Sequence, residues 1–435
     1  MGIAFKKFLL PLLLPFLLTS NGWCNLPIYP LPLVFKGEQI PNLIGEKPEN
    51  ISLWSFSKGK FQTIPLQIDQ VDDKGWVSFN PKRKTPGIQK MDQILWKKED
   101  MGQKAPKNAF PHLFEKLDSK GILLETEIIH KKNSSWVYFL ISPTPFNPKV
   151  ESSIQYFPED DFIITPRYYL GFQKVILANR FGWMQKDRNL GPNLLNRVSV
   201  HFRGKVFLGL FPVKLTEENL QNERIAYKKG PVRVIKRTQS TPRLPLGFKG
   251  PASITDYFCS ENAYQVKARI HFLPGSKSLL KDAFFKIYVD ISAQKEMVTI
   301  TLPLVEPFPI QKNLQPNTYP LGKMPPELIH FGNKSNPHRF LVHLNIPKEA
   351  QDVLRPNLLV YVHEPKDYPP QWGTLSFLVQ LVPDKKDVEF NLNLYSYFLD
   401  QKTMQPQKLM DAVLDSLQSP FTIEKIREFQ PQTNI

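Results

Sequence analysis

The sequence has 435 residues, of which 41% are hydrophobic and 12% aromatic, a composition that fills packed cores and excludes a globally disordered chain. Its 56 basic residues outnumber 40 acidic ones, and the formal charge of +16 suits anionic partners or reflects a general basic bias. Because only two cysteines occur, a disulfide scaffold, a CxxC redox pair and a cysteine zinc site are excluded.

The first 24 residues have the pattern of an export signal. Lys6 and Lys7 supply a positive start, an apolar run covers Phe8–Leu18, and Thr19–Cys24 form a short polar exit. The apolar run is shorter than the ~20 residues that a bilayer span needs, and prolines interrupt it. We therefore expect residues 1–24 to be removed as a signal peptide. The mature chain would be periplasmic or secreted, without a transmembrane segment and away from nucleic acid.

The cleavage position decides whether Cys24 and Cys259, the two cysteines, can pair. Cleavage after Gly22 would keep Cys24 and allow a Cys24–Cys259 disulfide in an oxidising compartment. Cleavage after Cys24 would leave Cys259 as a lone thiol, buried as a small apolar side chain. The sequence leaves both outcomes open.

Strand periodicity dominates the rest of the chain. The 41 prolines punctuate short apolar segments, a pattern that favours strands joined by turns over long helices. Alternate residues of Tyr264–Phe272 are apolar, as an antiparallel strand with one buried face requires. The same alternation predicts strands at Leu53–Phe56, Trp76–Phe79, Val198–Phe202, Phe285–Ile291, Met297–Leu302, Leu341–Ile346, Leu375–Val379 and Phe390–Tyr395.

Helical periodicity is clearest near the C-terminus. Apolar residues from Leu409 to Leu417 recur at helical spacing between Pro406 and Pro420, which predicts one short helix. We expect further helical turns at Ile423–Phe429. The helix should pack against the end of a sheet or reach a partner.

These elements predict a mainly β protein: an antiparallel β-sandwich or supersandwich with an N-terminal β module and a short C-terminal helix. A Pro-rich passage divides an N-terminal module, residues 25–148, from a central sandwich, residues 149–400. A second Pro-rich passage near residues 303–326 is expected to be a long excursion, and residues 401–435 a helical tail.

The N-terminal module contains the most patterned stretch of the chain. Three of its segments are distinctive: Ile64–Asp69 (IPLQID), Asp72–Gly75 (DDKG) and Asp92–Gly102. Aspartates in a turn cap free backbone N–H groups, which is the preferred interpretation of the first two segments. The alternative is a calcium site, because calcium takes several oxygen ligands, although the spacing differs from that of an EF-hand loop. Its ligands would be Asp69, Asp72 and Asp73.

The segments Ile64–Asp69 and Asp92–Gly102 match in spacing the pattern IPxQxDExDxxG followed by DELVFxxxDxG. In this the chain resembles a group of exported, poorly characterised bacterial β-rich proteins, and it is distantly similar to galactose-mutarotase-like supersandwich proteins. Gln70 and Gln93 stand where the pattern has glutamates, and Trp96 replaces a phenylalanine, so an acidic role is not carried over to the two glutamines. The resemblance implies a supersandwich fold near polysaccharide-degrading systems and assigns no activity.

Sugar chemistry of the mutarotase type would need an acid and a base close together in a concave sheet. His201 and His271 fall on polar faces of predicted strands, with Asp290 as the candidate carboxylate, although solvated histidines would show the same pattern. Glu159–Asp161 would suit glycoside hydrolysis if the carboxylates converge. Tyrosines beside charges suit a sugar-binding face, or else core packing. The candidate binding residues are Arg167, Tyr168, Tyr169, Arg203, Asp256 and Tyr257.

The sequence contains no nucleotide-binding glycine loop, GxSxG elbow or HExxH zinc motif, so no cofactor is predicted. The preferred hypothesis is non-catalytic binding of a glycan, such as polysaccharide or lipopolysaccharide, or of another cell-envelope component. The first alternative is a carbohydrate-active enzyme, an epimerase, lyase or hydrolase. The second is an envelope assembly or scaffolding factor that uses the C-terminal helix as its contact.

Overall fold

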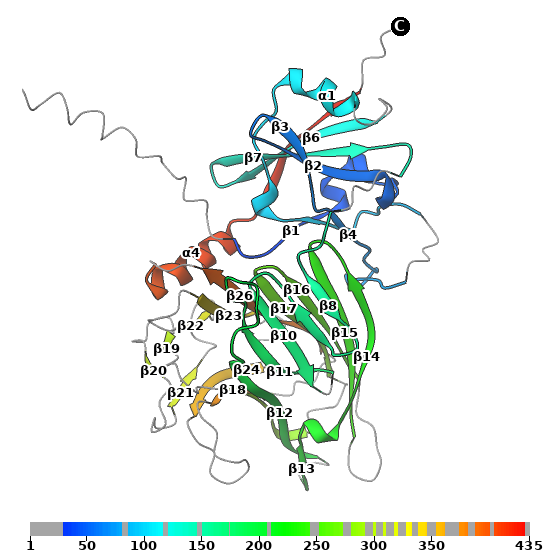
Figure 1. Cartoon of the computed structure of the whole chain (residues 1–435). Helices are drawn as coiled ribbons and strands as arrows, with labels where there is room; N and C mark the ends of the chain where they lie inside the picture. Colours follow the sequence, from blue (N-terminus) through cyan, green and yellow to red (C-terminus); the bar gives the residue numbers. More distant parts are fainter. Residues whose placement is uncertain are drawn as a thin grey trace, which may run out of the picture.

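Antiparallel β-sheets dominate the protein, which confirms the mainly β prediction (Figure 1). No helix in the described part of the chain is long and apolar enough to cross a bilayer. The computed structural model describes residues 29–80, 86–115, 121–145, 150–173, 175–206, 210–243, 252–272, 280–291, 299–301, 308–309, 317–320, 328–332, 338–345, 354–361, 374–381, 388–400 and 404–430.

The N-terminal module packs a five-stranded sheet, ordered β27-β6-β7-β2-β3, against a three-stranded sheet, ordered β1-β5-β4. Phe35 and Trp96 stack between the sheets at 4.8 Å, and Trp96 meets the ring edge of Phe139 at 5.7 Å. Helix α1 (Phe110–Glu115) covers the opposite face of the larger sheet. The module's strands, apart from β27, are β1 (Leu33–Lys36), β2 (Ile51–Ser57), β3 (Lys60–Ile64), β4 (Gln67–Asp69), β5 (Gln93–Trp96), β6 (Ile122–His130) and β7 (Asn133–Ile141).

A nine-stranded sheet forms the centre of the sandwich, in the order β14-β15-β16-β17-β26-β23-β22-β19-β20. It joins strands that lie far apart in sequence, because β17 pairs with β26 from Ala263–Tyr397 to Phe272–Val388. Its strands are β14 (Leu220–Lys229), β15 (Arg233–Pro242), β16 (Ser253–Ser260), β17 (Ala263–Phe272), β19 (Thr299–Thr301), β20 (Phe308–Pro309), β22 (Leu328–Gly332), β23 (His338–Asn345) and β26 (Val388–Asp400).

A four-stranded sheet, ordered β11-β10-β9-β8, packs on one face of the nine-stranded sheet. A six-stranded sheet, ordered β13-β12-β18-β25-β24-β21, continues from β11 toward the end of the molecule opposite the N-terminal module (Figure 1). The strands of these two sheets are β8 (Gln155–Phe157), β9 (Phe162–Ile164), β10 (Tyr168–Gln173), β11 (Leu177–Trp183), β12 (Leu195–Val206), β13 (Phe211–Leu215), β18 (Leu280–Ile291), β21 (Asn317–Pro320), β24 (Leu354–Tyr361) and β25 (Thr374–Leu381).

The predicted C-terminal helix is α4 (Pro406–Gln418), and its apolar side packs on the nine-stranded sheet. Leu409, Met410 and Val413 are fully buried against Leu341 and Tyr397. Of the two roles expected for this helix, packing against a sheet is the one observed.

The expected helical turns at Ile423–Phe429 are wrong, because this segment is strand β27 (Thr422–Phe429). It pairs with β6 from Thr422–Ile129 to Phe429–Leu123 and so completes the five-stranded sheet of the N-terminal module. Ile423 and Ile426 pack on the module's core, which outweighs local helical preference. The chain therefore returns to its first module after building the sandwich.

Several expectations fall where the structure is partly or wholly undescribed. The signal peptide, residues 1–24, and with it Cys24 lie outside the described residues. Of the Pro-rich passage near residues 303–326, the described parts are the short strands β20 and β21.

The predicted strand at Trp76–Phe79 is absent: only the isolated Val71–Val77 bridge occurs there.

Candidate functional site

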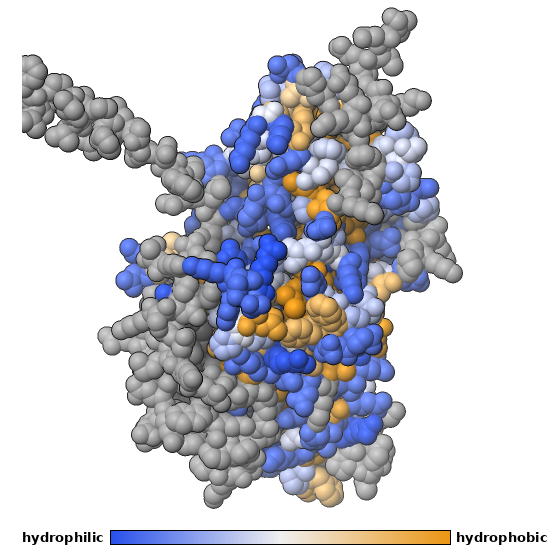
Figure 2. All heavy atoms as spheres, in the orientation of Figure 1, coloured by the Kyte–Doolittle hydropathy of each residue, from blue (hydrophilic) through white to orange (hydrophobic). Residues whose placement is uncertain are grey.

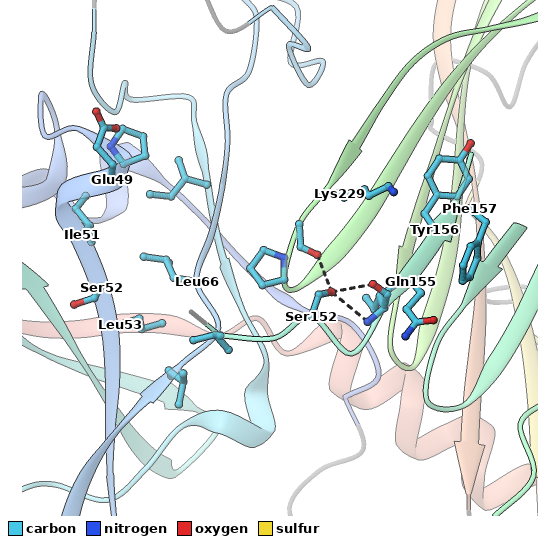
Figure 3. A pocket seen from close by; sticks show the side chains of 17 residues that line it. Glu49, Ile51, Ser52, Leu53, Leu66, Ser152, Gln155, Tyr156, Phe157 and Lys229 are labelled. Atoms are coloured by element: carbon cyan, nitrogen blue, oxygen red, sulfur yellow. Dashed lines mark hydrogen bonds between the residues drawn. The ribbon is translucent and has the colours of Figure 1, made fainter. Parts of the chain in front are cut away.

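A cleft of about 800 Å³ lies between the N-terminal module and the sandwich (Figure 3). One wall comes from β2, β3, β4 and the 3-10 turn Pro48–Asn50, and the other from β8, the segment before it and the β14–β15 turn. Apolar side chains line most of it, including the half-buried Leu66, Ile68 and Val150. Its volume falls in the range of about 300–1,000 Å³ that small-molecule sites occupy.

The IPLQID segment builds both the cleft wall and the contact with the sandwich. Side chains alternate along its extended backbone, so Ile64, Leu66 and Ile68 line the cleft. The two polar side chains between them, Gln67 and Asp69, bind the β14–β15 hairpin instead. One motif therefore fixes the position of the wall that it forms.

Asp69 is fully buried and binds two cations of the sandwich. Arg233 donates to its Oδ2 from Nη2 at 2.7 Å and from Nε at 3.0 Å, and Lys228 donates from Nζ to Oδ1 at 2.7 Å. Burial by itself raises the pKa of the Asp69 carboxyl, but Arg233, Lys228 and the hydrogen bond from Gln67 outweigh burial and hold the pKa below its ordinary value. The ionised carboxylate therefore clamps the module onto the sandwich.

Gln67 completes the clamp through backbone contacts. Its Oε1 accepts from the backbone N–H groups of Val232 at 3.1 Å and Arg233 at 2.9 Å. In the β14–β15 turn, a Cβ on Gly230 would lie 2.1 Å from that oxygen, so a side chain there would displace the Gln67 amide from this position. Arg233 Nη2 also donates to Gln93 Oε1 at 2.6 Å, so the glutamine that replaces an expected glutamate acts as a neutral acceptor.

An aromatic and cationic strip borders the cleft on the sandwich side: Tyr156 and Phe157 from β8, with Arg224, Tyr227 and Lys229 from β14. Arg224 donates from Nη1 to Tyr156 Oη at 2.8 Å, and its guanidinium lies 5.5 Å from the Tyr227 ring centre. Lys229 Nζ lies 6.0 Å from both tyrosine rings. Phe157 and Tyr227 are 42% and 44% exposed. The strip thus presents exposed rings beside the exposed cation of Lys229, whereas Arg224 also donates to the Pro158 carbonyl at 2.5 Å and lies 3.9 Å from Asp161.

The three aspartates of the calcium alternative do not form a metal site. Asp69 is committed to Arg233 and Lys228, and Asp72 Oδ1 accepts from the backbone N–H groups of Lys74 at 3.0 Å and Trp76 at 2.8 Å. The third, Asp73, is exposed. Among the described residues, no group of three or more His, Cys, Asp or Glu could hold a metal ion. The preferred interpretation, turn capping, holds for Asp72, whereas Asp69 binds two cations of the sandwich instead.

Tyr168 and Tyr169, expected on a sugar-binding face, are core residues. Tyr168 is fully buried, donates from Oη to the carbonyls of Ser260 and Ala263 at 3.0 Å, and stacks on Phe398 at 3.8 Å. Tyr169 is 4% exposed and donates to the Gly191 carbonyl at 2.9 Å. Neither ring can present a face to a sugar, so core packing is the correct interpretation.

The other candidate binding residues are also engaged inside the protein. Asp256 is fully buried and accepts from Nε and Nη2 of Arg237, both at 2.6 Å. Tyr257 is 5% exposed and donates to the Ile176 carbonyl at 3.1 Å. Arg167 is half-buried and precedes β10, on a different sheet from Asp256. These residues do not converge on one open surface.

The candidate catalytic residues are not assembled into an open site either. His201 is 2% exposed, with its Nε2 at 4.0 Å from Glu217 Oε2 and the ring of Tyr288 at 4.7 Å. Asp290 is also buried, and its register partner Arg197 lies four residues from His201 along β12, about 13 Å away. The face of β12 that the sequence assigns to solvent is therefore a buried one.

His271 and Arg203 lie apart from this pair. The backbone of His271 pairs with Glu389 in the nine-stranded sheet, whereas His201 belongs to the six-stranded sheet. The side chain of His271 lies outside the described residues. Arg203 is half-buried near the β12–β13 hairpin, opposite Lys214. The backbone of His271 therefore lies on a different sheet from His201, Asp290 and Arg203.

Of the acidic cluster Glu159–Asp161, only Asp161 turns inward. Its Oδ2 accepts from Lys236 Nζ at 2.6 Å, and its Oδ1 accepts from Tyr156 Oη at 2.9 Å. Lys236 is fully buried, and burial lowers its pKa to about 8 although Asp161 acts in the opposite direction. Glu159 and Asp160 are exposed, so the cluster is not a converging carboxylate pair.

Cys259 is a fully buried free thiol among the described residues. Burial raises its pKa to about 12, so it stays protonated and unreactive at neutral pH. Since Cys24 lies outside the described residues, the disulfide alternative stays a prediction.

Sequence reasoning missed the cleft, although one signal for it was present. Alternation in IPLQID places three apolar side chains on one side and two polar ones on the other. The opposite wall could not be recognised, because the chain reaches it more than 80 residues later, at Val150 and beyond.

No known family model matches this sequence, and no curated protein matches it. Among solved structures, the chain is similar to the Slr1438 protein from Synechocystis sp. PCC 6803, with 7% identity and a TM-score of 0.36, covering 59% of this chain and 100% of that one. It is also similar to a protein in glycosyl hydrolase family 38 from Enterococcus faecalis, with 12% identity and a TM-score of 0.46, covering 92% of this chain and 45% of that one. Neither likeness assigns an activity.

Proposed function

We propose that this chain is an exported protein that binds an anionic glycolipid of the cell envelope without catalysis, with lipopolysaccharide as the representative chemistry. The observation that carries the proposal is the apolar cleft with exposed rings and cations at its border. Export of the mature chain is part of the proposal and rests on the pattern of residues 1–24.

The apolar part of such a ligand suits the cleft. Leu66, Ile68 and Val150 are only half-buried, so their remaining apolar surface faces water when the cleft is empty. Covering it with acyl chain stabilises the complex by about 0.8 kcal/mol for each buried CH₂ group. A glycan without acyl chains would leave this surface uncovered.

The polar part suits the neighbouring strip. Exposed Phe157 and Tyr227 offer ring faces to sugar C–H groups, while exposed Lys229 offers charge to phosphate or carboxylate. The formal charge, +16 for the whole sequence and 16 − 2 = +14 without Lys6 and Lys7, acts in the same direction over longer range. Catalysis by His201 is disfavoured, because its side chain is only 2% exposed.

The test is equilibrium binding of the purified mature chain to lipopolysaccharide at physiological salt. Its deacylated saccharide and phosphatidylglycerol micelles serve as partial ligands. We expect the intact glycolipid to bind at least tenfold more tightly than either one, since each contacts only part of the site, and 1.4 kcal/mol corresponds to about tenfold. Lack of binding to all three, or equal binding of the saccharide alone, would overturn the proposal.

Two variants locate the site. Leu66→Asp places a carboxylate in the cleft and should weaken binding of the intact glycolipid about tenfold or more, whereas Leu190→Asp, at a 47% exposed leucine outside the cleft, should not. Lys229→Gln removes an exposed charge and should cost about threefold with a smaller salt dependence. Full binding by a folded Leu66→Asp variant would exclude the cleft.

A further inference from the structure

The N-terminal module and the sandwich are joined by a second polar contact besides that of Asp69 and Gln67. Figure 2 shows hydrophilic side chains beside an apolar patch where the two parts adjoin. Lys97, which follows β5 of the module, donates from Nζ to Oε2 of Glu261 at 2.5 Å. Glu261 lies in the turn between β16 and β17 of the sandwich. The two side chains are only 19% and 27% exposed, so solvent screens their ion pair in part.

A third charged group, Asp100, lies beside this ion pair. It ends the 3-10 turn Lys98–Asp100, and its backbone N–H donates to the Lys97 carbonyl at 3.2 Å. Its Oδ2 is buried and has no hydrogen-bond partner among the described residues. A carboxylate oxygen in such a place is costly when the group is ionised, because the charge has lost water without gaining a donor. The position therefore favours a protonated Asp100.

Two neighbouring carboxylates add to the effect of burial on Asp100. Glu99 of the same turn and Glu261 of the sandwich both repel the ionised form, and Lys97, which attracts it, is already bound to Glu261. Burial, the largest cause, and these two carboxylates raise the pKa of Asp100 to about 6, although Lys97 acts in the opposite direction. Three carboxylates therefore share one lysine at this interface.

A histidine lies near the same turn. Lys98, the other cation of the turn, acts on His130 of β6, and burial together with Lys131 and Lys98 lowers the pKa of that histidine. His130 therefore titrates below its ordinary range. Its effect on the interface has to be separated from that of Asp100 by substitution.

Separation of the module from the sandwich changes the surroundings of Asp100. It moves Asp100 away from Glu261 and toward water, so its pKa returns toward the ordinary ~3.9. The joined state then binds the proton more tightly than the separated state. By linkage, the joined state is favoured as pH falls from about 6 toward 4 and loses this advantage above about 6. Asp69 does not share this dependence, because Arg233 and Lys228 hold its pKa below the ordinary value.

We propose that Lys97, Asp100 and Glu261 form a latch between the N-terminal module and the sandwich that acid strengthens. At neutral pH the ionised Asp100 repels Glu261 and competes with it for Lys97. On acidification Asp100 takes up a proton and leaves Lys97 to Glu261. The latch is a property of the chain itself and does not depend on a ligand in the cleft, so it can hold or fail independently of the proposed glycolipid binding.

The test is hydrogen exchange of the purified mature chain, without ligand, at about pH 5 and about pH 7.5. The backbone N–H groups of Val232 and Arg233 donate to Gln67 across the interface, so their protection factors report whether the two parts stay joined. The two pKa values of Asp100 set an upper limit of about a hundredfold, which water around this half-buried side chain reduces. We expect protection to be about fivefold or more higher at the lower pH, and lower than that of β17 at both.

Three variants assign the effect. Asp100→Asn keeps the shape of the side chain but cannot ionise, so its protection at about pH 7.5 should come within about twofold of the value at about pH 5. Glu99→Gln removes an exposed carboxylate of the same turn and should keep most of the pH effect. Glu261→Gln removes the partner of Lys97 and should lower protection at about pH 5 by about threefold or more.

Three results would overturn the proposal. The first is an equal pH effect in Asp100→Asn and the unmodified chain, which would assign the effect to another group such as His130. The second is the absence of a pH effect in the unmodified chain. The third is exchange at Val232 and Arg233 that is as slow as in β17, since the interface would then open only when the whole protein unfolds.

Discussion

The residues of the most recognisable motif serve structure. Asp69 and Gln67 join the module to the sandwich, and Asp92 accepts from the backbone N–H groups of Val71 and Gln89, both at 2.9 Å. A Cβ on Gly102 would lie 2.4 Å from the Phe56 carbonyl oxygen. A pattern of acids and glycines in sequence thus reports buried hydrogen bonds and close backbone packing.

Removing the charge of Asp69 should weaken the fold strongly. Asp69→Asn leaves Arg233, whose side chain is 8% exposed, without its carboxylate, and an unpaired buried charge costs about 3–5 kcal/mol. Urea unfolding measures this loss. The matched control is Asp72→Asn, which keeps an acceptor at an exposed turn and should stay within about 0.5 kcal/mol of the unmodified protein. A loss below 1 kcal/mol for Asp69→Asn would show that the clamp is unimportant.

Lys236 makes stability depend on pH in the alkaline range. Its pKa is lowered by burial to about 8, whereas an unfolded lysine titrates near ~10.4, so the unfolded state binds more protons between these values. Lysine therefore contributes stability that rises as pH increases from 8 to 10. Relative to Lys236→Met, the unmodified protein should gain roughly 1–3 kcal/mol over this interval.

The measurement is urea unfolding of both proteins at several pH values. Asp161, Arg224, Cys259 and Tyr257 surround this position in both proteins, so the comparison isolates the effect of the lysine. Parallel stability curves for the two proteins would contradict the lowered pKa.

At the scale of elements, the sequence predicts where strands lie but not which of their faces are buried. Alternation correctly located β12, β17, β18, β23, β25 and β26. In β12, however, Ser199 and His201 are 2% exposed, because other parts of the chain cover the face that they share. Period-two alternation shows which residues share a face; it does not show which face a distant segment covers.

Trp76–Phe79 shows the opposite error. Its apolar residues suggested a strand, yet they pack on the outer face of the nine-stranded sheet. The ring centre of Trp76 lies 4.4 Å from Lys267 Nζ and 4.3 Å from the guanidinium carbon of Arg269. The ring centre of Phe79 lies 4.7 Å from the guanidinium carbon of Arg237. The cations of β17, assigned to a solvated face, thus meet aromatic rings. Local sequence contains no sign of a contact across 190 residues.

A partly buried ion pair adds to the pairing of strand β27 with β6. Arg427 Nη1 donates at 2.8 Å to Oε1 of Glu125, a carboxylate that is only 4% exposed. Arg427→Ala should therefore cost about 1–3 kcal/mol in urea unfolding, because the buried acceptor loses a charged partner. Lys425→Ala, on the same strand and exposed, should change stability by less than about 0.5 kcal/mol. Equal effects of the two substitutions would contradict this role of the pair.

At the scale of the whole molecule, both ends of the chain build the N-terminal module. Residues 29–145 supply seven strands, and β27 supplies the edge strand next to β6. The division into residues 25–148 and a separate tail after residue 401 follows composition, which carries no information on strand exchange between distant segments. The order of the strands in this sheet could not be deduced from local periodicity.

Loss of the last strand should open the module selectively. A chain ending at Gln418 keeps α4 and loses β27, so hydrogen exchange should accelerate in β6 and β7 while β15–β17 keep their protection. The control is a chain ending at Gln430, which lacks only the last five residues of the sequence and keeps the whole of β27. Unchanged exchange in β6 of the shorter chain would contradict a structural role for β27.

The return of β27 to β6 also fixes the order of events in folding. Closing a loop of nearly 300 residues costs about 5 kcal/mol of chain entropy, so the pairing gains little until the intervening sandwich has folded and brought its ends together. The N-terminal module is synthesised first, but its five-stranded sheet is therefore the last part of the fold to be completed. Until then the edge of β6 is unpaired, and a protease or chaperone that recognises this edge would distinguish a complete chain from one missing its final residues.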